Sequence, residues 1–150
     1  MLTEEQIFKT ILTGCKKAIE QNEIPVCAIV VDENNSIVSK AINRTKMDVL
    51  GHAEIRAIKK AAKKLKSRYL YNCKIYVNLE PCIMCAFACV LSRISEIVYV
   101  LRDQKFGGVY SLYQIPIDIR LNHRIIVRKA SYFEEEFKEL LRKFFKNSNL

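Results

Sequence analysis

The sequence predicts an α/β fold, namely a three-layer α/β/α sandwich around a five-stranded mixed sheet. Segments of strand and helix periodicity alternate in the order αββαβαβ(α)βα. Strands separated by helices should be parallel neighbours with helices on both faces of the sheet, whereas the first two strands are close enough for an antiparallel hairpin. At 150 residues, half of them hydrophobic, the chain can bury one substantial core. Residues 1–150 are therefore expected to form a single domain.

The first helix and a hairpin open the chain. Thr3 with Gln6 indicates a capping box, and the apolar positions that follow recur at helical spacing until Pro25. The continuous apolar run 26–31 predicts a strand buried on both faces. Turn residues follow it, and segment 37–42 supplies the hairpin partner.

The middle of the chain alternates helices and strands. A helix is expected from about His52 to Lys66, with an apolar side that includes Leu65. Segment 73–79 predicts the third strand, and Pro81 begins a helix that runs through Leu91, because proline suits a first helical turn.

The last elements are two strands and two helices. Segment 96–100 predicts the fourth strand and 124–129 the fifth, with a short helix near 111–115 between them. Ser131 with Glu134 indicates a second capping box that begins the final helix. Its apolar stripe consists of Phe133, Phe137, Leu140, Leu141 and Phe144.

Hydrophobicity, cysteine number and net charge indicate in which compartment the protein works and what kind of partner it binds. The longest apolar run, residues 82–91, is only about half a membrane span, and the N-terminus is polar, so a cytoplasmic protein without a membrane anchor is expected. In that reducing compartment six cysteines favour metal binding, catalysis or core packing over disulfides. The net charge of +9 favours an anionic partner such as nucleic acid, although it also serves solubility alone.

Cys82 and Cys85 lie one helical turn apart on one face, the spacing at which two thiolates reach one zinc ion. A helix N-terminus also favours thiolate over thiol. Taken alone, the pair also suits a core position or a redox dithiol.

His52 and Glu54 are two residues apart, so they converge only on a point beyond a helix N-terminus. Alone, His52 suits a cap; with the cysteines it completes a set of three zinc ligands and leaves one position for water, as in catalytic zinc sites. Cys89 is too far along its helix to share the ion, and His123 is the other histidine to consider. Glu54 then becomes the general acid and base, and the combination His-x-Glu with Pro-Cys-x-x-Cys is typical of zinc deaminases of nucleobases.

Over nearly its full length the chain resembles the bacterial tRNA-specific adenosine deaminases of the cytidine deaminase superfamily. The matching stretches are 23–26, 43–44, 52–55, 76–86, 92–94, 102–103, 122–124 and 140–146. The Asn122-His123-Arg124 and double-phenylalanine stretches discriminate most, since relatives acting on free bases generally lack them.

The resemblance implies a sheet of the cytidine-deaminase type and hydrolysis of the wobble adenosine in a tRNA anticodon loop to inosine, with release of ammonia. It implies a homodimer with one zinc ion per subunit, held by His52, Cys82 and Cys85, with Glu54 as the catalytic residue. The substrate-binding residues that it implies are Asn43, Ala53, Asp103, Lys105, His123, Arg142, Phe144 and Lys146.

The chain departs from the family pattern at Cys27, Phe87, Leu101 and a shortened loop before His52. Two other function classes stay open. One is a deaminase of a free nucleobase or nucleoside, of guanine or cytosine type, using the same zinc chemistry. The other is a zinc-stabilised RNA-binding module in which Glu54 is only a helix-terminal carboxylate.

Overall fold

A single five-stranded sheet organises residues 1–147, the part of the chain that the computed structural model describes. The strands are β1 (Cys27–Val31), β2 (Ile37–Ile42), β3 (Lys74–Leu79), β4 (Glu96–Leu101) and β5 (Ile126–Lys129). Their spatial order is β2-β1-β3-β4-β5. Strand β1 is antiparallel to both β2 and β3, whereas β3, β4 and β5 are parallel, so the predicted mixed sheet is confirmed.

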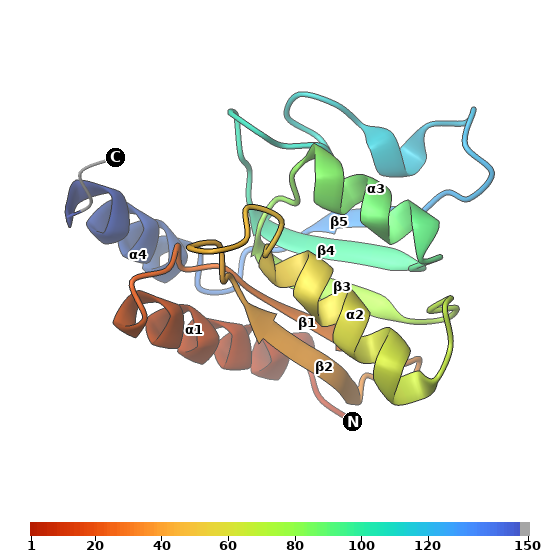
Figure 1. The fold of residues 1–150 in the computed structure, drawn as a ribbon, viewed down its shortest axis with the longest axis horizontal. Helices are drawn as coiled ribbons and strands as arrows, with labels where there is room; N and C mark the ends of the chain where they lie inside the picture. The colour runs from red at the N-terminus through yellow and green to blue at the C-terminus, as the bar shows by residue number, and fades with distance from the viewer. Residues whose placement is uncertain (148–150) are drawn as a thin grey trace.

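Helices cover both faces of the sheet, which confirms the three layers. They are α1 (Glu4–Glu20), α2 (Ala53–Leu65), α3 (Ile83–Leu91) and α4 (Glu134–Asn147), with a 3-10 helix η1 (Ile115–Ile117) before β5. Helices α2 and α3 lie on one face and α1 and α4 on the other (Figure 1). The Thr3–Gln6 capping box that begins α1 is present.

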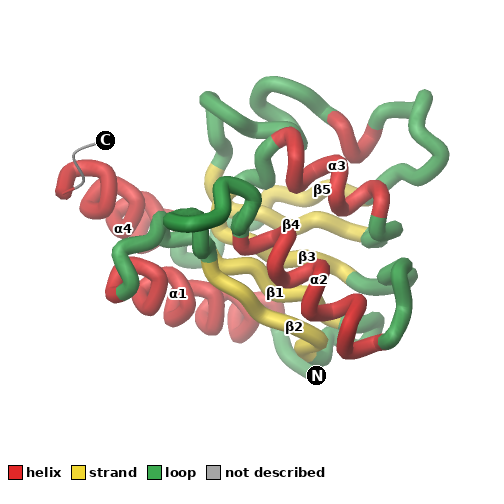
Figure 2. The backbone as a smooth tube through the Cα atoms, viewed as in Figure 1, coloured by secondary structure: helices red, strands yellow, loops and turns green. Residues whose placement is uncertain are grey.

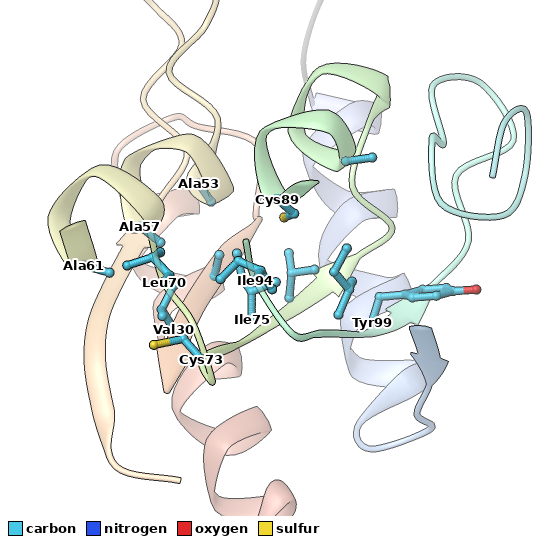
Figure 3. Packing of buried hydrophobic residues seen from close by; sticks show 14 of the residues in the cluster. Val30, Ala53, Ala57, Ala61, Leu70, Cys73, Ile75, Cys89, Ile94 and Tyr99 are labelled. Carbon is cyan, nitrogen blue, oxygen red and sulfur yellow. The ribbon is translucent and has the colours of Figure 1, made fainter. Parts of the chain in front are cut away.

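Two hydrophobic clusters share the sheet. Beneath α2 and α3, alanines and Cys89 of the helices pack on one side of the strands, together with Val30, Ile75 and Tyr99 (Figure 3). Beneath α1 and α4, the opposite side of the same strands packs on Phe8 and its neighbours. Strand β1 faces both clusters, and this is why its sequence is apolar without alternation.

The functional edge of the sheet is where β2, β3 and β4 end. Because β2 and β3 are each antiparallel to β1, they run in the same direction, and β4 runs with them. The segments that follow these strands therefore gather at one edge, and α2 and α3 begin there (Figure 2).

The final helix does not begin with the predicted Ser131–Glu134 capping box. Its first residue is Glu134, and Phe133 lies directly before it with a φ of 56°. The Phe133 carbonyl accepts a hydrogen bond from the Phe137 N–H, and the two rings make an edge contact. Phe133, partly buried against the core, thus precedes the first helical residue, and the helix begins two residues later than the Ser131 pattern predicted.

The short helix expected near 111–115 is also misplaced, since η1 lies at 115–117. The amides of Leu112 and Tyr113 donate to the Gly107 carbonyl, so this stretch folds back on the preceding loop. In α2, Leu65 is 44% exposed and does not belong to the buried side.

Two of the expected departures from the family pattern, Cys27 and the loop before His52, each lie in close contact with a glycine. A Cβ at Gly14 of α1 would lie 2.5 Å from the Cys27 sulfur, so a glycine there makes room for the larger Cys27. In the shortened loop, a Cβ at Gly51 would lie 2.1 Å from the Arg44 carbonyl oxygen, and the Gly51 carbonyl accepts from the Arg44 N–H. The short loop is therefore closed by direct backbone contact.

Candidate metal centre and substrate pocket

His52, Cys82 and Cys85 meet at the beginnings of two helices. His52 is the N-cap residue of α2, Cys82 is the N-cap of α3, and Cys85 lies in the first turn of α3. The His52 Nδ1 atom lies 3.6 Å from the sulfur atom of each cysteine. The convergence that the sequence predicted is present, with the difference that His52 and Cys82 precede the helices rather than lie within them.

The spacing of these donors fits a zinc ion. Tetrahedral zinc with Zn–S of about 2.3 Å and Zn–N of about 2.0 Å separates a ligand nitrogen from a ligand sulfur by about 3.5 Å, close to the observed 3.6 Å. Within residues 1–147, the three side chains form the one group of metal-donor residues whose ligand atoms all lie within 4.8 Å of one another. One imidazole and two thiols are also the donor types that zinc prefers.

The electrostatics of the cluster favour a thiolate. A hydrogen bond from the Cys85 thiol, with a further contribution from His52, lowers the pKa of Cys82 to about 4. The same interaction with Cys82 raises the pKa of His52 above its ordinary value. Negative charge at Cys82 is thus already stabilised by its neighbours, as a metal ligand requires.

Glu54 is buried beside this cluster. Its side chain is 4% exposed, and burial raises its pKa to about 7. A carboxyl group with such a pKa can both accept and donate a proton near neutral pH. The side chain lines the same cavity as His52 and Cys82, so proton transfer and metal binding share one site.

That cavity has a volume of about 380 Å³ and opens at the edge of the sheet where β2, β3 and β4 end. Its lining residues are Ile24, Val26, Asn43, Thr45, Val49, His52, Glu54, Leu79, Glu80, Cys82, Asp103, Phe106 and Phe145. The walls are mostly apolar, with a few polar groups, which is typical of a pocket that orients a small ring system.

Asn43 and Ala53, two predicted substrate contacts, bind one another. The Asn43 Oδ1 atom accepts a hydrogen bond of 2.8 Å from the Ala53 N–H. Ala53 therefore does not offer this N–H to a ligand. Asn43 lines the pocket, and among the described residues its Nδ2 group has no hydrogen-bond partner.

The remaining predicted contacts are spread over the surface. Asp103 lines the pocket. Lys105, Arg142 and Lys146 are exposed, and each lies within three residues of Phe106 or Phe145, which line the pocket. His123 does not belong to the metal-donor group, because its Nε2 atom lies 2.7 Å from the Ile94 carbonyl oxygen, beyond the C-terminal end of α3.

Phe145, and not Phe144, lines the pocket. The two rings make a T-shaped contact with centroids 5.4 Å apart, Phe144 being half-buried and Phe145 50% exposed. The sequence-based choice of Phe144 thus falls on the neighbour of the residue that reaches the cavity. Successive residues of a helix point about 100° apart, so neighbouring residues such as Phe144 and Phe145 lie on different faces of α4.

Two buried carboxylates escaped the sequence reasoning. Glu23, 5% exposed, accepts from the Thr45 and Lys46 amides, and Glu80, 2% exposed, accepts from backbone amides of the segment 103–111. Both segments contribute pocket residues. For Glu80 the sequence signal was an acidic residue directly between the strand 73–79 and Pro81, whereas Glu23 ends the polar stretch 20–23 and carried no such signal.

Cys89, a residue of α3, faces the hydrophobic core and does not belong to the metal-donor group of His52, Cys82 and Cys85, as expected (Figure 3). Cys15, Cys27 and Cys73 are likewise buried free thiols. Among the described helices, none has both the length and the apolar character needed to cross a membrane.

Comparison with known proteins places these features in a family. Residues 2–149 match the MafB19-like deaminase family. A tRNA-specific adenosine deaminase of Aquifex aeolicus (strain VF5) is 45% identical over 146 residues, covering 95% of this chain and 94% of that protein. The tRNA-specific adenosine deaminase of Streptococcus pyogenes serotype M1 is 36% identical over 131 residues, 85% of this chain and 76% of its own.

Solved structures agree on the fold. A structure from work on A-to-I editing by tRNA:A34 deaminases superimposes with a TM-score of 0.83 at 32% identity, covering 89% of this chain and 97% of that one. Guanine deaminase from Nitrosomonas europaea has a TM-score of 0.80 at 22% identity, over 96% of this chain and 85% of its own, and shows a shared fold alone. The chain therefore belongs to the tRNA-specific adenosine deaminases, within the MafB19-like deaminase family, and is an enzyme of this class.

Proposed function

We propose that this enzyme converts the wobble adenosine of a tRNA anticodon loop to inosine by zinc-dependent hydrolysis. The observation that carries the proposal is the burial of Glu54 beside His52, Cys82 and Cys85 in one cavity. Relatives named as tRNA-specific adenosine deaminases support the choice of substrate.

In this reaction water adds across the N1=C6 bond of adenine, and the C6–N6 bond then breaks with release of ammonia. A zinc ion held by His52, Cys82 and Cys85 would supply hydroxide near neutral pH. Glu54 takes a proton from water and gives it to ring N1 as oxygen adds at C6. It then takes the proton of the new C6 hydroxyl and gives it to the departing amine, which leaves the C6 carbonyl of inosine. Its pKa of about 7 suits both halves of this task.

The pocket holds the flipped-out base, and its rim meets the RNA. Asn43 presents its free Nδ2 donor to the base, while Asp103 and Phe145 lie along the wall. Lys105, Arg142 and Lys146 are exposed and supply positive charge for the phosphate backbone. The chain's net charge of +9 favours the same partner, and His123 is proposed as a further contact to RNA.

We also propose a homodimer that forms through the outer side of α3. Ile83 and Phe87 are each 40% exposed there and Leu91 is 59% exposed. Leu112 and Tyr113, in the loop before η1, are 50% and 58% exposed. Exposed apolar residues of this kind are typical of a protein–protein interface, and two-fold dimers are the commonest homo-oligomers. Phe87, one of the departures from the family pattern, enlarges this apolar surface.

Residues 1–150 are taken as one deaminase domain, since both core clusters lie on one sheet. The enzyme is placed in the cytoplasm, where its tRNA substrate is found and where six free thiols stay reduced.

The test is incubation of the zinc-loaded protein with an anticodon stem-loop carrying a wobble adenosine, followed by detection of inosine. A stem-loop with guanosine at that position is the matched control, and free adenosine, guanine and cytosine run alongside. Inosine from the first stem-loop alone is expected. Ammonia from a free base, without inosine in the RNA, would contradict the proposal.

A further inference from the structure

Glu80 is a buried carboxylate at the end of β3, two residues before the metal-donor Cys82. Its Oε1 atom accepts from the Asp103 N–H at 3.0 Å and from the Ser111 hydroxyl. Its Oε2 atom accepts from the amides of Val109, Tyr110 and Ser111 at 3.2, 2.8 and 2.9 Å. Five donors from both ends of the segment 103–111 thus meet on one side chain.

The segment 103–111 forms one wall of the pocket. Asp103 and Phe106 line the cavity, and the Gly108 N–H donates to the Pro81 carbonyl at 2.9 Å. An isolated bridge between Cys82 and Gly107 holds the segment against the start of α3. The wall therefore contacts the backbone at Cys82, one of the metal-donor residues.

The contact leaves no spare room. A Cβ at Gly107 would lie 2.3 Å from the Glu80 Oε2 atom and 2.6 Å from the Asp103 carbonyl oxygen. The turn is thus wrapped tightly around the carboxylate. If the Glu80 acceptor is removed, the amides of Asp103, Val109, Tyr110 and Ser111 lose their partner, and the Gly108–Pro81 hydrogen bond and the Cys82–Gly107 bridge remain to hold the segment.

We propose that Glu80 is a positioning residue that fixes the 103–111 segment as a wall of the pocket and thereby sets the affinity for the RNA strand around the target base. This role rests on the proposed function for its substrate, but the ordering of the segment does not. Glu80 also contributes to the lining of the cavity, but all of the hydrogen bonds that its carboxylate accepts come from the segment 103–111, so the proposed role is exerted through that segment and its pocket residues Asp103 and Phe106.

The isosteric variant Glu80→Gln separates this role from simple packing. Glutamine has the same shape, but its amide nitrogen is a donor and would face backbone N–H groups that are also donors. Ser111→Ala is a milder variant that removes a single donor to Glu80 and leaves the fold intact.

Matched controls lie at the other end of the sheet. Glu96, 9% exposed, pairs with Arg128 and Lys74, and Ser95 donates its hydroxyl to the Cys73 carbonyl at 2.8 Å. Glu96→Gln and Ser95→Ala thus remove the same chemical groups far from the pocket.

Two measurements test the proposal in zinc-loaded protein: amide hydrogen exchange without RNA, and the Kd of a wobble-adenosine stem-loop. In Glu80→Gln the amides of 103–111 should exchange about tenfold faster or more, and the Kd should rise by about tenfold, with zinc content unchanged. Ser111→Ala should shift both in the same direction by less, and both controls should leave them unchanged.

Unchanged exchange in the segment, an unaltered Kd despite faster exchange, or equal effects in Glu96→Gln would each overturn the proposal. Failure of wild type to form inosine while still binding the stem-loop would instead reject the proposed function, and the exchange and Kd results would still decide the role of Glu80.

Discussion

The side-chain oxygen of Asn43 accepts a hydrogen bond of 2.8 Å from the Ala53 N–H, the first amide of α2. The bond satisfies one of the helix-start amides that have no partner within the helix. His52 occupies the N-cap position but makes no capping bond with its side chain. Its ring instead faces the two cysteines, with Nδ1 at 3.6 Å from each sulfur atom.

Replacement of Asn43 should separate capping from substrate binding. Asn43→Asp keeps an acceptor for the Ala53 N–H but loses the Nδ2 donor, so it should keep a wild-type Tm and lose about tenfold or more in kcat/KM. Asn43→Ala should lose both, with a free energy of unfolding lower by about 1 kcal/mol. Thermal unfolding and steady-state kinetics on the stem-loop check this pair. Full activity in Asn43→Asp would show that the donor is not used.

Removal of a ligand should abolish metal binding, whereas removal of a nearby core thiol should not. Cys85→Ala is expected to lose stoichiometric zinc, and a strong chelator should inactivate the wild-type enzyme until zinc is restored. Cys89→Ala is the control: Cys89 is one helical turn further along α3 but packs in the core. Metal analysis of purified proteins measures both. Zinc loss in Cys89→Ala equal to that in Cys85→Ala would contradict the assigned ligand set.

The sequence was most informative where chemistry depends on local geometry. His52, Glu54, Cys82 and Cys85 each lie within a few residues of a helix start, so residue spacing alone indicated that they could converge. The apolar run 26–31 likewise predicted a strand buried on both sides, which β1 confirms.

The sequence was uninformative where a contact joins distant segments. Glu80 meets amides of residues 103–111, and no periodicity marks such a pairing. The final helix begins directly after Phe133, whose ring packs against the core, and not after Ser131, and this tertiary contact is not visible in the capping pattern. The choice between Phe144 and Phe145 depended on helix rotation, which is fixed by packing against the rest of the fold.

Phe145 and Phe144 should differ in their effect on RNA binding. Phe145 lines the pocket and is half-exposed, so its ring is available for stacking on a base. Phe145→Ala should weaken stem-loop binding by about 1–3 kcal/mol, the usual contribution of one stacked base. Phe144→Ala, the matched control, should reduce thermal stability with a smaller effect on Kd. A larger loss of affinity in Phe144→Ala would reverse this assignment.

The ion pair between Glu4 and Arg128 should make stability depend on acidity. The hydrogen bond that the Arg128 guanidinium donates to the Glu4 carboxylate holds the pKa of Glu4 below the ordinary value of 4.5. Because the folded pKa is the lower one, the stabilisation is fully present above pH 4.5 and is lost as the pH falls through the folded value. The difference in free energy of unfolding between wild type and Glu4→Gln should therefore shrink from pH 7 to pH 3. A difference that stays constant would exclude this linkage.

The most direct test of the catalytic account is Glu54→Gln assayed for zinc content and inosine formation in the same preparation. The variant keeps the size of the buried side chain but cannot carry the proton between water and the base. The account predicts one zinc ion per chain, unchanged affinity for the wobble-adenosine stem-loop, and inosine formation reduced by about a thousandfold or more. Inosine formation at the wild-type rate by zinc-loaded Glu54→Gln would contradict it.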